Sequence, residues 1–280
     1  WFASQRILLF SLTCLVAGAW FFIRTLRSDH PIVDLRAFTN RNFAIGAGMG
    51  FIIGIALYGL VYIMPLFFGY VRGYSSLQIG QVMFVTGLTM FLCAPIVGQL
   101  SNRLDLRIML FMGLLLVGVG TIMNANLTVE SGFWQFCVPQ IVRGMGLILC
   151  IIPASRIALG TLPPSEVGNA SGLFNVMRNL GGAMGLALID TVRDIREDFH
   201  WNQLIPAIDT SREVVVAEIA KYQAMLAGSV PDTYHAAVAM LAQRVSQQAQ
   251  VLAFNDIFTW MGLIYIASVP LVFLLRRISA

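Results

Sequence analysis

Seven long apolar stretches constrain this chain more than any other feature. A transmembrane helix needs about 20 predominantly apolar residues. The chain of 280 residues is 58% hydrophobic and only 11% charged, whereas soluble domains are about a quarter charged. We therefore predict an all-α integral membrane protein with seven transmembrane helices. The stretches cover residues 7–23, 43–68, 77–100, 108–124, 133–158, 169–191 and 256–275.

The positions of arginine in the short loops predict the orientation. Basic residues concentrate in cytoplasmic loops. Here they follow the first, third and seventh stretches, whereas the opposite loops hold only Arg72 or the acid Glu130. We expect the Arg-rich loops in the cytoplasm and the protein in the inner (plasma) membrane. Those loops carry Arg24, Arg27, Arg36, Arg41, Arg103, Arg107, Arg276 and Arg277.

The one long connection, residues 192–252, is expected on the periplasmic side. Apolar residues recur there at near-helical spacing on both sides of a break at 228–232, which predicts two amphipathic helices. These helices either cap the ends of the membrane helices or form a docking surface for a partner. The sequence leaves both readings open.

The composition disfavours several functions. Basic residues stand singly or in pairs between apolar blocks, unlike the clustered basic stretches of nucleic-acid-binding proteins. The four cysteines lie inside apolar runs, and no nucleophile, metal-ligand or phosphate-loop pattern is present. We therefore expect no catalytic residues, no metal and no cofactor.

Two arginines lie near the middle of predicted membrane helices. Arg143 falls in the fifth stretch and Arg178 in the sixth. A central arginine costs about 2.5–3.5 kcal/mol on insertion scales, so both are expected to face the bundle interior or a water-filled cavity. Each either bonds helix carbonyls in a structural role, contacts substrate, or influences a proton site.

The sixth stretch carries a continuous stripe at helical spacing. Asn175 and Arg178 form its polar half together with Ser171, and Gly182 and Gly185 form its bare half. Small residues let helices approach closely, so one half is expected to pack while the other lines a path. A packing role for the whole stripe is the alternative.

The second stretch shows a related pattern. Three glycines recur at every fourth position and are followed by Tyr58 and Tyr62, which we expect to line a cavity. The expected helix-packing glycines of the two stretches are Gly46, Gly50, Gly54, Gly181, Gly182 and Gly185.

These segments resemble a known family. Residues 98–107, with Gly98, Arg103, Asp105 and Arg107, resemble the degenerate second copy of the cytoplasmic loop motif of the major facilitator superfamily. The segments 143–153, 162–172 and 175–185 resemble EmrB/QacA-type drug:proton antiporters, which have fourteen helices. Residues 31–43 are similar to that family's junction into its C-terminal half.

The resemblance implies a division of the chain and a set of partners. Residues 1–41 would be the end of the central extra helix pair with its linker, and 42–280 the C-terminal six-helix bundle with the outer loop 192–252. The chain looks like part of a longer protein whose N-terminal half would carry the antiporter motif and the membrane-embedded acids. Implied partners are this half, the lipid bilayer, an EmrA-type periplasmic adaptor and a TolC-type outer-membrane channel.

The function implied is proton-coupled export of amphipathic drugs or toxic compounds by alternating access, with the proton gradient as energy source. The expected cavity residues are Tyr58, Tyr62, Arg143, Asn175 and Arg178. One alternative is export of a specific metabolite or siderophore. An alternative from another class is a non-transporting membrane sensor or scaffold.

Overall fold

The predicted all-α architecture is confirmed. The computed structural model describes residues 4–27, 35–209, 212–228 and 231–275, and every regular element in these ranges is a helix. Residues 31–34 of the expected family junction, and Arg276 and Arg277, lie outside the described residues. The main helices are α1 (Gln5–Arg27), α2 (Arg41–Leu66), α3 (Ser76–Leu100), α4 (Leu106–Ile122), α5 (Phe133–Leu159), α6 (Pro164–Leu204), α7 (Glu213–Leu226) and α8 (Thr233–Ser268).

Each of the seven apolar stretches falls mainly in one of these helices, and three of them (43–68, 108–124 and 256–275) run past its end. The chain is therefore a multi-pass membrane protein. Among the described residues, five helical segments are both long and apolar enough to cross a membrane. The apolar α4 is shorter, with 17 residues. The five segments are Gln5–Arg27, Arg41–Val71, Ser76–Leu100, Phe133–Leu159 and Thr233–Leu274.

Side-chain caps fix where several helices begin. Asn40 accepts hydrogen bonds from the backbone N–H groups of Asn42 and Phe43 at the start of α2. Ser75 and Gln78 form a capping box at the start of α3. These side chains satisfy donors that the first helical turn leaves without partners. Each of the two helices therefore begins at a defined residue.

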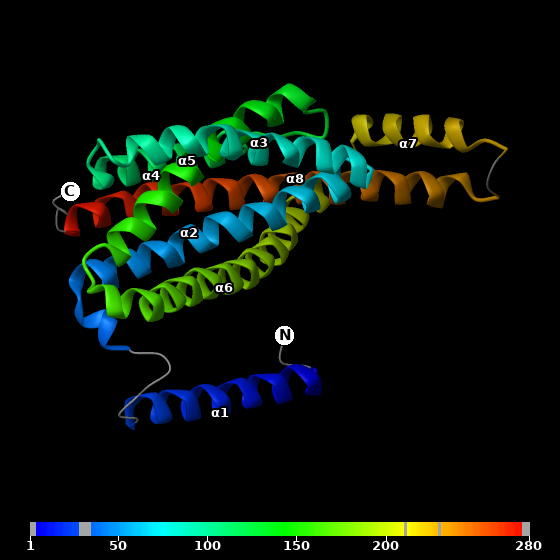
Figure 1. Ribbon diagram of the computed structural model, residues 1–280. Coiled ribbons are helices and arrows are strands. Elements are labelled where there is room, and N and C mark those ends of the chain that lie inside the picture. The colour runs from blue at the N-terminus through cyan, green and yellow to red at the C-terminus, as the bar shows by residue number, and fades with distance from the viewer. Residues whose placement is uncertain (1–3, 28–34, 210–211, 229–230, 276–280) are drawn as a thin grey trace.

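Helices α2 to α6 and α8 form the bundle, and α1 lies apart from it (Figure 1). Within its described range α1 has no buried residue. Aromatic side chains of the bundle core cluster most densely near the end of α2. There Phe67 and Phe68, in the π-helical turn η2 (Phe67–Val71), make edge contacts with Phe136 of α5.

Helices α2 and α6 touch through their backbones. A Cβ atom added at Gly54 would lie 2.0 Å from the carbonyl oxygen of Arg178, and one at Gly181 would lie 2.1 Å from that of Phe51. Both distances are far shorter than any van der Waals contact. Only glycine fits at these two positions.

The connection between the last two membrane helices differs from the expectation. Helix α6 continues past residue 191 to Leu204, and α8 already begins at Thr233, so the second expected amphipathic helix is the first part of α8. Only α7 is a separate helix. The apolar residues recur at helical spacing both in a surface helix and in a membrane helix that extends beyond its apolar stretch. The sequence pattern therefore does not distinguish the two. We call residues 192–252 the projection.

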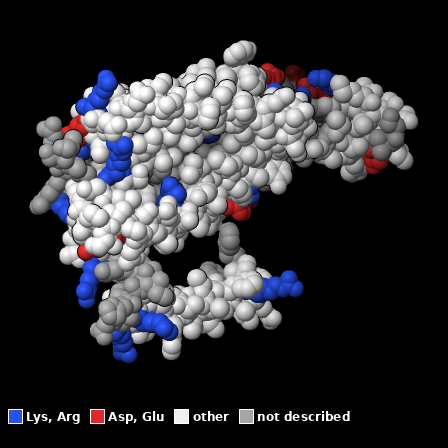
Figure 2. All heavy atoms as spheres, in the orientation of Figure 1, with Lys and Arg blue, Asp and Glu red and all other residues white. Residues whose placement is uncertain are grey.

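Charges separate along the bundle. In Figure 2, Arg side chains gather at the end where α2, α4 and α6 begin, and most Asp and Glu lie toward the projection, which also holds the single Lys of the chain. We call the first the Arg-rich end. A bundle with apolar sides and charged ends matches a membrane as solvent.

Candidate functional site

The five expected cavity residues fall into separate places. Tyr58, Asn175 and Arg178 lie on the face shared by α2 and α6. Tyr62 lies nearer the projection, between the same helices. Arg143 lies inside the bundle against α3.

The α2–α6 face holds two polar pairs. The Tyr58 hydroxyl donates a hydrogen bond to Oδ1 of Asn179 at 2.9 Å. Nη2 of Arg178 donates to Oδ1 of Asn175, one turn earlier, at 2.7 Å. Tyr58 is 38% exposed, and Arg178 is partly buried. This face is open enough to meet a ligand or another helix.

Arg178 has no acidic partner among the described residues. Its hydrogen bond goes to an amide oxygen, and its buried Nε has no hydrogen-bond partner. A charge at membrane depth requires water, a counter-ion or a polar partner. The α2–α6 face can therefore attract an anionic or strongly polar group.

Glycines place these polar groups. The ring of Tyr58 lies directly over Gly182, where an added Cβ would be 2.2 Å from Cδ2. A Cβ added at Gly50 would lie 2.9 Å from the Phe174 ring, and one at Gly185 would lie 3.0 Å from the Ile55 side chain. The bare half of the stripe on α6 thus lies against α2, whereas in the polar half the backbone of Arg178 touches α2 and the Asn175 side chain is exposed.

Tyr62 belongs to a charged group near the projection. Its hydroxyl donates to Oδ1 of Asp190 at 3.1 Å, and the same oxygen lies 3.2 Å from Nη2 of Arg193. Arg193 also pairs with Asp194 at 2.8 Å. The Asp190 side chain is 28% exposed, so this carboxylate is linked to α2 rather than free at the surface.

Arg143 is enclosed by the bundle. It is 1% exposed, and its Nη2 donates to the hydroxyl of Thr86 on α3 at 3.1 Å. Thr86 in turn donates to the fully buried Gln140. Nε and Nη1 of Arg143 have no hydrogen-bond partner within the described residues. In this conformation Arg143 ties α5 to α3 and does not share a surface with Arg178.

Sequence reasoning missed Asn179, Thr86 and Gln140. Asn179 lies next to Arg178 in sequence, and a search for polar residues one turn from Asn175 would have found it. Thr86 and Gln140 are uncharged polar residues inside apolar stretches, where a partner is required. The sequence alone does not identify that partner.

The loop motif forms a tight turn after α3. Asp105 caps α4 by accepting from the backbone N–H of Arg107 at 3.0 Å. Arg103 is exposed, and no atom lies within 4 Å of a Cβ added at Gly98. Arg156 of α5 holds the turn, because its Nη1 donates to the Ser101 carbonyl oxygen at 3.1 Å and to Asn102 Oδ1 at 2.6 Å.

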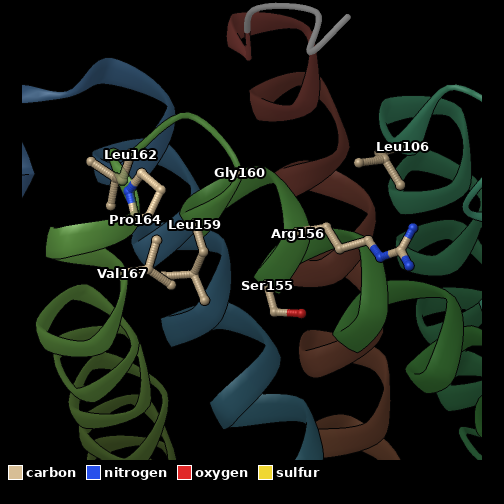
Figure 3. A pocket seen from close by; sticks show the side chains of 8 residues that line it. All are labelled: Leu106, Ser155, Arg156, Leu159, Gly160, Leu162, Pro164 and Val167. Atoms are coloured by element: carbon tan, nitrogen blue, oxygen red, sulfur yellow. The ribbon is translucent and has the colours of Figure 1, made fainter. Parts of the chain in front are cut away.

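A pocket of about 680 Å³ lies at the Arg-rich end, near the loop motif. Figure 3 shows Leu159, Leu162, Pro164 and Val167 gathered around the α5–α6 turn, whereas the Arg156 side chain extends toward the opposite side, where Leu106 lies. The start of α4, the end of α5 and the start of α6 contribute its walls. The lining residues are Leu106, Ser155, Arg156, Leu159, Gly160, Leu162, Pro164 and Val167.

The described residues contain no group of three or more His, Cys, Asp or Glu side chains that could hold a metal ion. Within the same residues the four cysteines are free thiols.

Comparisons with known proteins agree with this arrangement. The family model described as Major Facilitator Superfamily matches residues 7–186. The chain is 35% identical over 277 residues to the colistin resistance protein EmrB of Acinetobacter baumannii, covering 99% of this chain and 54% of that protein.

Two further relatives are similarly matched. The multidrug export protein EmrB of Escherichia coli K12 is 27% identical over 281 residues, covering 96% of this chain and 54% of the relative. The fatty acid resistance protein FarB of Neisseria gonorrhoeae is 25% identical over 279 residues, covering 99% and 54%. The chain thus spans about half the length of the curated relatives it matches.

Proposed function

Because the chain belongs to the Major Facilitator Superfamily, we propose that it is the C-terminal half of an EmrB-type exporter that moves amphipathic compounds out of the cell. The complete transporter would work by alternating access, with two bundles rocking around a central site. Proton influx would drive export, so the energy source is the proton gradient and no cofactor is needed. The proposed role is transport and not catalysis.

One observation carries this proposal, namely the open polar face of α2 and α6. This face presents Arg178, Asn175 and Tyr58 at the surface of the bundle. The other outward surfaces of the bundle are largely apolar. Polar groups at membrane depth are expected where they line a water-filled path or meet a partner. The printed names of the relatives, which include multidrug export and resistance to colistin and fatty acids, support export of amphipathic compounds.

The proposed orientation places the Arg-rich end in the cytoplasm and the projection in the periplasm of an inner-membrane protein. The charge separation in Figure 2 supports it, because basic residues favour the cytoplasmic side. The N-terminal half would supply the coupling carboxylates. None of the described carboxylates forms an ion pair with Arg143 or Arg178.

We also propose that the projection binds an EmrA-type adaptor that leads to a TolC-type channel. Helix α7 carries exposed apolar residues on the two flanks of its buried stripe, with Val214 73% and Met225 64% exposed on one flank and Val216 51% exposed on the other. Exposed apolar residues on both flanks leave room for a partner to extend the small core between α7 and α8. The docking reading of this segment is thus preferred to a cap over helix ends.

Replacement of Arg178 tests the proposed transport function. We expect Arg178→Ala and Arg178→Leu to abolish substrate-driven proton flux in proteoliposomes of the full-length transporter, because the face loses its charge while folding is retained. Arg178→Lys should keep part of the flux. The matched control is Val176→Ala on the same helix, since Val176 is 58% exposed on an apolar surface. Wild-type flux in Arg178→Ala would contradict the proposed site, and absence of any substrate-driven flux in the wild type would favour a sensor or scaffold.

A further inference from the structure

The pocket at the Arg-rich end is separate from the polar face of α2 and α6. Its walls come from the ends of α4, α5 and α6, and it contains none of the five residues expected in the central cavity. The Asn40 side chain accepts from the Thr161 hydroxyl at 3.2 Å, which fixes the α5–α6 turn to the start of α2. The pocket is therefore formed by elements that are held in place.

Its size and lining select the kind of ligand. A volume of about 680 Å³ lies within the roughly 300–1,000 Å³ typical of small-molecule sites. Leu159, Leu162 and Val167 form an apolar wall that Figure 3 shows on one side of the space. A molecule that fills it needs an apolar body of drug size.

Arg156 supplies the polar end. It is the only charged residue in the lining, and no ion pair to it is found within the described residues. Its Nη1 is held by Ser101 and Asn102, and the side chain as a whole is exposed. A guanidinium that is fixed at one nitrogen and open at the others matches a carboxylate, which it binds through two parallel hydrogen bonds.

We propose that this pocket is a loading site for amphipathic carboxylates. Arg156 pairs with the carboxylate, and the apolar wall covers the hydrocarbon body, before the molecule moves to the central cavity. The role of the pocket in loading the central cavity rests on the proposed export function. Binding of a carboxylate to the pocket does not depend on that function. Charge complementarity excludes an amphipathic amine of the same length from this site.

The test compares two probes of equal chain length and opposite charge, dodecanoate and dodecylamine. Their binding to the purified full-length transporter in nanodiscs is measured for the wild type, Arg156→Gln, Arg156→Lys and Val167→Trp. We expect Arg156→Gln to weaken dodecanoate binding by about tenfold or more, since a charge-assisted pair is lost. Arg156→Lys should restore part of it, and dodecylamine binding should not change in either variant.

Val167→Trp fills the pocket without touching the charge. It should weaken dodecanoate binding even though Arg156 is intact, which separates occupancy of the pocket from a loose surface attraction. Arg27→Gln is the matched control, because Arg27 is an exposed arginine of α1 at the same membrane side and lies outside the pocket lining. Melting temperatures show that each variant is folded.

The outcomes separate this proposal from the proposed function. If folded Arg156→Gln and Val167→Trp bind dodecanoate as the wild type does, the site is wrong even where transport is normal. Equal losses of dodecanoate and dodecylamine binding in Arg156→Gln would also overturn it. Selective loss of dodecanoate binding in a protein that shows no proton flux would keep the site and reject the exporter.

Discussion

In the bundle, α2 and α6 meet through backbone atoms, whereas in the projection α7 rests on α8 through a few side chains. The bundle contact has no room for a Cβ at Gly54 or Gly181. The core of the projection consists of Val215, Ile219, Tyr222 and Ala237, with a few partly buried neighbours.

The difference shows two ways of holding helices together. Lipid is as apolar as the side chains, so helices within a membrane associate through close packing and interhelical hydrogen bonds. Outside the membrane, water drives apolar side chains together. The bundle should therefore be sensitive to one added methyl group, and the projection should be removable without loss of the bundle.

The largest effect is expected at Gly54. In Gly54→Ala the new Cβ would collide with the Arg178 carbonyl and neighbouring backbone of α6, and neither helix can yield locally. We expect a loss of about 3 kcal/mol, the upper end for overpacking. The measurements are yield of monodisperse protein and melting temperature in detergent.

Gly48→Ala is the control for this substitution, because no atom lies within 4 Å of its added Cβ. It should be neutral or stabilise α2 by less than about 1 kcal/mol, the difference in helix propensity. If Gly54→Ala melts like Gly48→Ala, the backbone contact between α2 and α6 does not hold the bundle.

A smaller effect on folding is expected from removing the α7 hairpin. Replacing residues 209–244 with a short Gly/Ser linker should leave the bundle folded and proton flux intact. It retains the bond from Gln247 to the Val71 carbonyl at 2.7 Å and the contacts of Arg196 and His200 with Asp256, each at 2.7 Å. Co-purification of the EmrA-type adaptor should fall.

This deletion separates the two readings of the projection. Loss of the protein from the membrane would show that α7 caps the bundle. Undiminished adaptor binding would contradict docking on α7. A variant that cuts 196–248 is a poorer test, because it also removes Arg196, His200 and Gln247.

The smallest effect is expected at the start of α8. The backbone N–H of His235 donates to Asp232 at 3.1 Å and its ring lies 2.6 Å from the same carboxylate, which lowers the pKa of Asp232 below its usual 3.8. A lowered pKa means that the ionised cap stabilises the helix above about pH 4 and that this contribution is lost as pH falls through the lowered value. The protection of amides in the first turn of α8 against exchange, relative to their intrinsic rate at each pH, should therefore fall below about pH 4.

The bundle should not respond to this change. Asp232→Asn keeps a capping oxygen and should remove most of the acid dependence. If exchange in α8 shows the same acid dependence in this variant, the Asp232 cap is not the cause.

The membrane helices could be predicted because apolar length is a direct physical signal. The extension of α6 to Leu204 and the early start of α8 at Thr233 could not. A protruding helix has the same period as one lying on a surface, and the sequence marks no end where the membrane ends. Only spatial neighbours distinguish the two.

The sequence predicted which polar residues lie in the membrane helices, but only partly where their side chains lie in the bundle. Spacing correctly joined Asn175 to Arg178, since a helix brings residues three apart onto one face. It could not tell that Arg143 is enclosed by Thr86 and Gln140. Nor could it find the Arg156 pocket, because its walls combine the α5–α6 turn with the start of α4, which is about 50 residues earlier in the chain.

The length of α6 has a mechanical consequence. With 41 residues in one continuous helix, it rises about 60 Å, about twice the hydrocarbon thickness of about 30 Å. A rod that pivots within the membrane swings its far end through an arc, so a small tilt next to Arg178 becomes a larger sideways displacement near Leu204. Because Gly54 of α2 touches the Arg178 carbonyl of α6 through backbone atoms, α2 would have to follow the same tilt.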